Sequence, residues 1–255
     1  MASTVTSAPF TTPAVTPRPD ERAPTPVTKR RLSILALLIA AGLAVATLPA
    51  AAASTVVLHY SGTEKAGTTV ANDTSGHDND GTLHGVKTTG SAYQFNPTTS
   101  YIRVAASTSI DPGRLNYSYT VSINIPTSTV FTHDFSLVRR GSSKFAGPYY
   151  KMEMVFNRTT HNMRLECAFR DSTRAHESVS TSGNTLNDGV WHTLTCTKTR
   201  RTVSLTKDGV VHAKPAVLGN LSSTQPLFFG AEHVGPTIFW EHFPGRMRKI
   251  TITKG

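Results

Sequence analysis

The segments Trp191-His-Thr-Leu-Thr-Cys196 and Thr202-Val-Ser-Leu-Thr-Lys-Asp-Gly209 decide the fold class. In the first segment His192, Leu194 and Cys196 share one face, and the three threonines between and after them share the other. A period of two predicts a β-strand with one face on a core and one in solvent. We expect Trp191 to pack at the edge of that core, with ligand stacking as the alternative.

The dipeptide Asp208-Gly209 follows the second segment and favours a tight hairpin turn. Both central residues of a type I′ turn need a positive φ, which Asp-Gly supplies readily. The turn therefore predicts a hairpin between the strands 202–207 and 210–213.

The chain has two cysteines, Cys167 and Cys196. Along Met163–Arg170, Cys167 shares a face with Met163, Leu165 and Phe169, so both cysteines are predicted to point into the core. For an exported chain we expect a Cys167–Cys196 disulfide, which requires Cα atoms within about 4.4–6.8 Å.

Further strands are predicted throughout residues 54–255, and no long segment has helical periodicity. The clearest is Tyr117–Ile125, in which large apolar residues alternate with small polar ones. Short strands at this spacing are typical of an all-β sandwich. The remaining predicted strands are 56–60, 100–104, 134–140, 149–157, 163–170, 191–199, 202–207, 210–213, 226–230 and 247–253.

Residues 1–53 have the composition of an export segment. Residues 1–31 are rich in Pro and Thr and are predicted to be disordered. Lys29-Arg30-Arg31 precedes an apolar run, and the alanines before Ser54 supply a cleavage site, so 32–53 is predicted to be the hydrophobic region and cleavage site of a secretory signal peptide. An uncleaved signal anchor and twin-arginine export are the alternatives. We expect a secreted, extracellular domain over 54–255 without a stable membrane span after cleavage.

The predicted domain is moderately basic. Residues 1–53 hold five of the 26 Lys and Arg and two of the 16 Asp and Glu, which leaves 21 basic and 14 acidic residues and a net charge of +7 for 54–255. The basic residues form small clusters, such as Arg246/Arg248-Lys249. Solvated strand faces are one explanation and attraction to an acidic cell-surface polymer is the other. No motif supports nucleic-acid binding.

Four segments in order resemble the laminin G-like (LamG) domains of the concanavalin A-like lectin/glucanase superfamily, in the form common in exported bacterial proteins. They are Asp73-Thr-Ser-Gly-His-Asp-Asn-Asp-Gly-Thr-Leu-His-Gly85, Tyr101-Ile-Arg-Val104 leading into Tyr119–Ser122, Gly189–Cys196 with Leu205–Gly209, and Leu227–Gly230 with Phe243–Ile252. The resemblance implies an antiparallel jelly-roll β-sandwich. Members of the family bind glycans, proteins or steroids, and distant branches hydrolyse polysaccharides, so the fold leaves the ligand open.

The acidic residues argue against a hydrolase. Glycosidases need two carboxylates across the scissile bond, and the Glu-x-Asp-x-x-Glu run of laminarinase-type relatives does not occur. The nearest candidate is Glu153, alone between two methionines, and Glu166 has no acidic residue two positions away. We therefore predict a binding module and not an enzyme, with a carbohydrate or cell-surface polymer as ligand. An adhesion protein with a protein partner is the second reading, and a polysaccharide-active hydrolase the third.

Two groups of residues are candidate sites. Asp73 and Asp80, with Asp78 and Asn79 between them, concentrate oxygen ligands that Ca²⁺ prefers, although turn-forming hydrogen bonds explain the same residues. Calcium is thus the one candidate cofactor. Tyr149, Tyr150 and Trp240 are predicted to lie exposed at loop rims and to stack on a sugar, with packing at the sandwich edge as the alternative.

Overall fold

The computed structural model describes residues 53–181, 186–233 and 239–255. The predicted disordered extension and signal peptide, 1–52, therefore lie outside the described residues. These described residues form one compact unit. No part of the described chain forms a helix of the length and apolarity that a membrane span requires.

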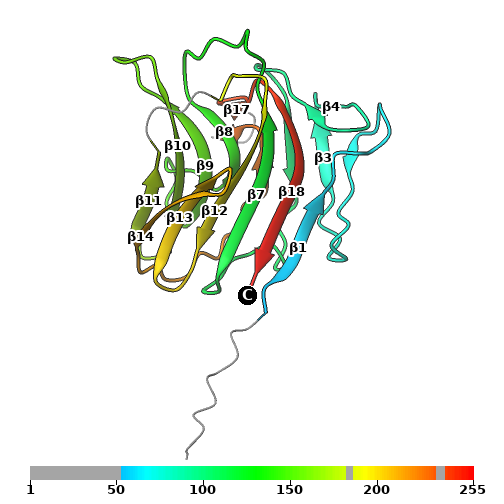
Figure 1. The fold of residues 1–255 in the computed structure, drawn as a ribbon. Helices are drawn as coiled ribbons and strands as arrows, with labels where there is room; N and C mark the ends of the chain where they lie inside the picture. Colours follow the sequence, from blue (N-terminus) through cyan, green and yellow to red (C-terminus); the bar gives the residue numbers. More distant parts are fainter. Residues whose placement is uncertain (1–52, 182–185, 234–238) are drawn as a thin grey trace, which may run out of the picture. The chain divides into compact units, whose positions relative to one another are not determined.

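Two eight-stranded antiparallel sheets pack face to face (Figure 1). Sheet A has the order β14-β13-β12-β7-β18-β5-β4, and β1 also pairs with β18. Its strands are β14 (Val210–Pro215), β13 (Thr202–Lys207), β12 (Trp191–Lys198), β7 (Tyr117–Asn124), β18 (Arg246–Lys254), β5 (Tyr93–Gln94), β4 (Lys87–Thr88) and β1 (Thr55–Tyr60).

Sheet B has the order β11-β10-β9-β8-β15-β6-β3-β2. Its strands are β11 (His176–Ser180), β10 (Met163–Arg170), β9 (Tyr149–Phe156), β8 (Phe135–Arg140), β15 (Leu227–Phe229), β6 (Tyr101–Val104), β3 (Gly81–His84) and β2 (Val70–Ala71). A separate two-stranded ribbon joins β16 (Glu232–His233) to β17 (Phe239–Trp240). The predicted all-β jelly-roll sandwich is confirmed.

The core fills the space between the sheets with the residues that alternation placed inward. On β7, Tyr117, Tyr119, Val121 and Ile123 are all buried. On β10, Leu165 and Phe169 are buried opposite them. Apolar burial of this extent is the main force that holds two sheets together.

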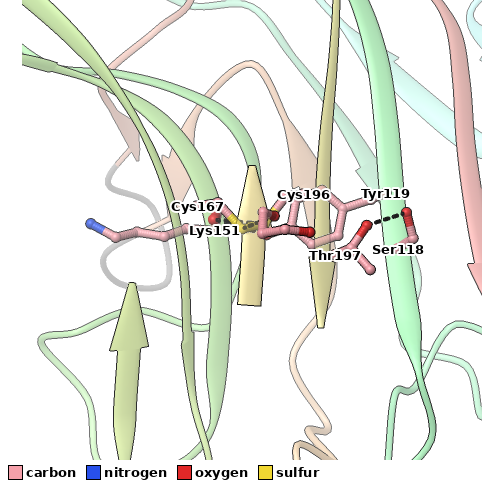
Figure 2. The surroundings of a disulfide bond; sticks show 7 residues. Ser118, Tyr119, Lys151, Cys167, Cys196 and Thr197 are labelled. Atoms are coloured by element: carbon pink, nitrogen blue, oxygen red, sulfur yellow. Dashed lines mark hydrogen bonds between the residues drawn. A yellow bond between two sulfur atoms is a disulfide. The ribbon is translucent and has the colours of Figure 1, made fainter. Parts of the chain in front are cut away.

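The disulfide joins the two sheets through this core (Figure 2). Cys167 lies on β10 of sheet B and Cys196 on β12 of sheet A, with their Cα atoms 5.6 Å apart. The hydroxyl of Tyr119 lies 2.8 Å from Cys196 Sγ and donates to the carbonyl oxygen of Lys151 at 2.8 Å. The predicted Cys167–Cys196 bond is confirmed, and it links the two sheets covalently.

Three local predictions have different outcomes. The Asp208-Gly209 turn is confirmed, since both residues have positive φ, 49° and 83°. No strand is predicted after residue 60 until residue 100, but Gly81–His84 forms β3 and pairs with β6. The expected packing of Trp191 at the edge of the core is wrong. Trp191 points to the same side of β12 as Thr193, so its ring lies on the outer face of sheet A, with the guanidinium carbon of Arg248 4.0 Å from the ring centre.

Candidate functional site

A groove of about 450 Å³ lies on the outer face of sheet A. Its volume falls in the range of about 300–1,000 Å³ that is typical of small-molecule sites. Its lining comes from the strands β1, β7, β12 and β18 and from the loop after β1. The lining residues are His59, Ser61, Thr63, Thr120, Ser122, Thr193, Lys249 and Thr251.

A β-bulge on β18 shapes this groove. Arg248 pairs with Ser122 and Thr251 with Thr120, so β18 has one residue more than β7 over this interval. Lys249 takes up the extra length with a φ of +50°, and its N–H donates to the carbonyl of Ser61 at 3.2 Å. Bulges re-aim side chains in this way, and here an exposed ammonium is placed at the groove.

Hydroxyl groups form rows across the sheet, because every second residue of adjacent strands points outward. Thr120 Oγ1 lies 2.9 Å from Thr195 Oγ1, and Ser122 Oγ lies 3.2 Å from Thr193 Oγ1. Each hydroxyl can donate one bond and accept two. The rows therefore keep capacity for a hydroxyl-rich ligand even while they bond to each other.

The strands of this face carry charge of one sign. The five strands β1, β7, β12, β13 and β18 contain no Asp or Glu. Arg246, Arg248 and Lys249 lie together on β18, and the first two place their guanidinium carbons 5.7 Å and 4.0 Å from the centre of the Trp191 ring. Arg248 Nε is buried and has no hydrogen-bond partner within the described part of the chain. The face therefore attracts anions.

Sequence reasoning did not place a site here. The signal was present in the outward threonines of 191–199 and in the Arg246/Arg248-Lys249 cluster, but both were also explained by ordinary solvation of a strand face. The bulge is what combines them, and an extra residue in a strand has no clear mark in a single sequence.

The Asp73–Asp80 loop does not fit a calcium site. Asp73 Oδ1 accepts the N–H groups of His59 and Ser75, and Oδ2 accepts the Ser75 hydroxyl and the N–H of Asn79, all at 2.9 Å. These four donors fill the lone pairs of the carboxylate. Asp80 Oδ1 accepts the N–H of Asp73 at 2.7 Å. Within the described residues no group of three or more His, Cys, Asp or Glu side chains is arranged to hold a metal.

The same bonds set the acidity of Asp73. Burial alone would raise its pKa, but the N–H groups of His59, Ser75 and Asn79 outweigh burial and hold the pKa below the usual range. The ionised Asp73 carboxylate thus links the loop to β1 through hydrogen bonds.

The family model of the laminin G domain matches residues 153–255, from within β9 of sheet B to the end of β18 of sheet A. Over these residues the chain is similar to the laminin G domain. No curated protein matches the chain.

Solved structures with the same fold have low sequence identity to this chain. The binding domain of Paraclostridial Mosquitocidal Protein 1 has a TM-score of 0.58 at 15% identity and covers 78% of this chain and 48% of its own. Domain 4 of AbnA, an extracellular arabinanase of Geobacillus stearothermophilus, in complex with arabinotriose, has a TM-score of 0.56 at 16% identity and covers 79% and 93%. The chain spans about half the length of the binding domain of the mosquitocidal protein.

A third structure is the binding domain of botulinum neurotoxin DC in complex with SialylT. It has a TM-score of 0.55 at 10% identity and covers 78% of this chain and 47% of its own. Identities this low show a shared fold, and the ligand must come from the site itself.

The fold buries two of the three predicted rim aromatics. Tyr149 and Tyr150 are 5% and 1% exposed, so their predicted exposure is wrong. Tyr150 points into the core and bonds Tyr117 Oη at 2.9 Å, while the guanidinium of Arg170 covers the Tyr149 ring at 4.4 Å. A covered ring offers no face to a sugar. Trp240 is exposed, at 55%, with Lys144 Nζ 4.6 Å from its ring centre.

The two glutamates considered for catalysis lie in a buried ion network on sheet B. Arg139 Nη1 donates to Glu153 Oε2 at 2.9 Å, and Lys151 bonds Glu153 as well. Lys151 Nζ lies 3.1 Å from Glu166. Burial alone would raise the pKa of Glu166, but Lys151 and Arg164 together lower it. Both carboxylates are thus engaged by basic partners, as structural ion pairs are.

Proposed function

We propose that the laminin G-like domain is a binding module for an acidic carbohydrate polymer, which lies along the outer face of sheet A. The observation that carries this proposal is the charge of the face: a groove of about 450 Å³, lined by hydroxyls, opens beside Lys249 and Arg248 on strands that contain no acidic residue.

The chemistry of the groove matches both parts of such a ligand. Serine and threonine hydroxyls exchange hydrogen bonds with sugar hydroxyls in either direction. Lysine and arginine pair with carboxylate or sulfate groups, and arginine does so in a bidentate manner. The related structures support a binding role, since one is a complex with arabinotriose and two are toxin binding domains.

Export is part of the same proposal. A carbohydrate polymer of the cell surface is accessible to a protein outside the cytoplasm, and the composition of residues 1–53 is that of an export signal. The basis for a non-catalytic role is that Glu153 and Glu166 are held in ion pairs.

Binding to polygalacturonate and to heparin, with neutral dextran as control, tests the proposal by titration calorimetry. We expect the acidic polymers to bind, dextran to bind more weakly, and affinity to fall as salt rises through about 0.15 M, where screening acts within about 8 Å. Lys249→Gln should weaken binding about two- to fivefold, the effect of one exposed ion pair.

Arg158→Gln is the matched control, because Arg158 is an exposed cation on the β9–β10 loop, outside the groove. Equal binding of dextran and the acidic polymers would remove the acidic part of the proposal. Binding that Lys249→Gln and Arg158→Gln weaken equally would show that net charge acts and that the groove does not.

A further inference from the structure

A second groove, of about 220 Å³, lies between residues 141–148 and 222–225, away from the outer face of sheet A. One wall carries Phe145, Ala146 and Pro148, and the other carries Ser223, Thr224 and Gln225. The groove has an apolar side and a polar side. Phe145 is 48% exposed although it is a large aromatic residue.

The apolar wall is held in place by one arginine of β10. Arg170 donates from Nε to the carbonyl of Gly147 at 2.9 Å and from Nη2 to those of Phe145 and Ser142 at 2.5 and 3.2 Å. Its guanidinium also stacks on Tyr149. Charge-assisted bonds of this number fix the loop, so Phe145 is presented on a rigid support.

A second arginine, on β8, holds the polar wall. Arg140 donates from Nη2 to the carbonyl of Ser223 at 2.5 Å and from Nε to that of Gln225 at 2.9 Å. It is fully buried, and its third bond goes to the carbonyl of Ile110 at 2.9 Å. Both walls are therefore ordered by arginine side chains, Arg140 buried and Arg170 partly buried, before any ligand arrives, which lowers the entropic cost of binding.

Glycine closes the base of the loop. Gly141 has a φ of +72°, and a Cβ there would lie 2.8 Å from the carbonyl oxygen of Pro148. The chain thus returns on itself closely between these two residues. Ser142 fixes the floor, because its hydroxyl donates to Glu232 at 2.8 Å.

We propose that this groove is a second ligand site and binds a single sugar ring. A pyranose has an apolar C–H face and a polar hydroxyl edge, which correspond to the Phe145–Pro148 wall and to the side chains of Thr224 and Gln225. The volume of the groove lies below the lower end, about 300 Å³, of pockets for drug-sized ligands, so one ring fits better than an extended oligomer. The site does not depend on the groove of sheet A.

Methyl glycosides of glucose, galactose, mannose, N-acetylglucosamine and arabinose are the probes, added at millimolar concentration to the disulfide-bonded protein. Backbone amide NMR shifts report the contact. We expect one or more of these sugars to shift the amides of 143–147 and 222–225, while Lys249→Gln leaves these shifts unchanged.

Phe145→Ala should weaken that binding about tenfold, since an aromatic contact of this kind is worth about one decade in affinity. Gln225→Ala should weaken it severalfold through lost hydrogen bonds. Both side chains are exposed, and the amide spectrum of each variant verifies its fold. Val130→Ala is the control, since Val130 is an exposed apolar residue that does not line the groove.

Three results would overturn the inference. No sugar of the panel shifts the groove amides; the shifts persist undiminished in Phe145→Ala; or a proline-rich peptide shifts them and no sugar does. If the acidic polymers do not bind but the sugars still shift the amides of 143–147 and 222–225, the proposed function is contradicted and the second site is supported.

Discussion

Removal of the Cys167–Cys196 disulfide should destabilise the domain by about 3.6 kcal/mol. The cysteines are 29 residues apart, and the chain-entropy relation for a loop of that length gives roughly 12 cal/mol/K, or about 3.6 kcal/mol at 25 °C. For a domain of about 200 residues, 1 kcal/mol shifts Tm by about 2–4 °C, so the melting temperature should fall by roughly 7–14 °C. Because the bond joins opposite sheets, this loss should affect the whole sandwich.

Urea unfolding followed by tryptophan fluorescence measures this difference. The oxidised protein is compared with the same protein held in reductant, and with Cys167→Ala/Cys196→Ala, in which the removed sulfur atoms add a packing loss. Alkylation followed by mass measurement establishes the redox state of each sample. An unchanged midpoint after complete reduction would refute the reasoning, because the open loop would then cost nothing in the unfolded chain.

Three further changes have defined outcomes. Asp171→Asn should cost about 2 kcal/mol at pH 7, since Asp171 accepts bonds from Thr173, Ala175 and Gly219. Burial alone would raise the pKa of Asp171, but these hydrogen bonds outweigh burial and lower it. Chemical denaturation should therefore show that the wild type is more stable than the variant at neutral pH, and that this difference disappears as pH falls through the lowered pKa. Glu241 has its pKa raised to about 7 by burial and by the carboxylates of Glu153 and Glu232. The protonated Glu241 side chain stabilises the fold fully below pH 4.5, the pKa of the unfolded chain, and this contribution is lost as pH rises through 7. Glu241→Gln should therefore remove roughly 1–3 kcal/mol of the decline in stability between pH 5 and 8. An unchanged dependence of the unfolding free energy on pH would contradict this. Gly141→Ala should lower stability more than Gly76→Ala in thermal melts, because both have positive φ but only Gly141 meets a backbone oxygen.

The long strands were predictable because each carries its own periodic pattern. Met163–Arg170 was predicted with the bounds that the structure has, and 202–207 likewise. The two-residue strands β2, β4, β5, β16 and β17 have no room for a period and are defined by their partners. They were therefore not predicted from the sequence.

Side-chain environment was predictable only where one strand determines it. Cys196 was placed correctly by alternation, and Trp191 would have been placed correctly by the same rule. Tyr149 and Tyr150 follow Gly147-Pro148, which suggested a loop rim, but both belong to β9, where neighbouring strands and Arg170 cover them. Contacts of this kind join segments distant in sequence, and no local pattern records them.

The pairing of the first and last strands also determines how the domain bears load. Thr55 lies opposite Lys254 in the antiparallel ladder, so β1 and β18 leave the sandwich at the same end. A tension applied through these two residues would peel the ladder apart one hydrogen bond at a time instead of shearing all of them together. We expect the domain to open at low pulling force from this edge, and the covalent link between the sheets to confine the stretch of chain that can then extend.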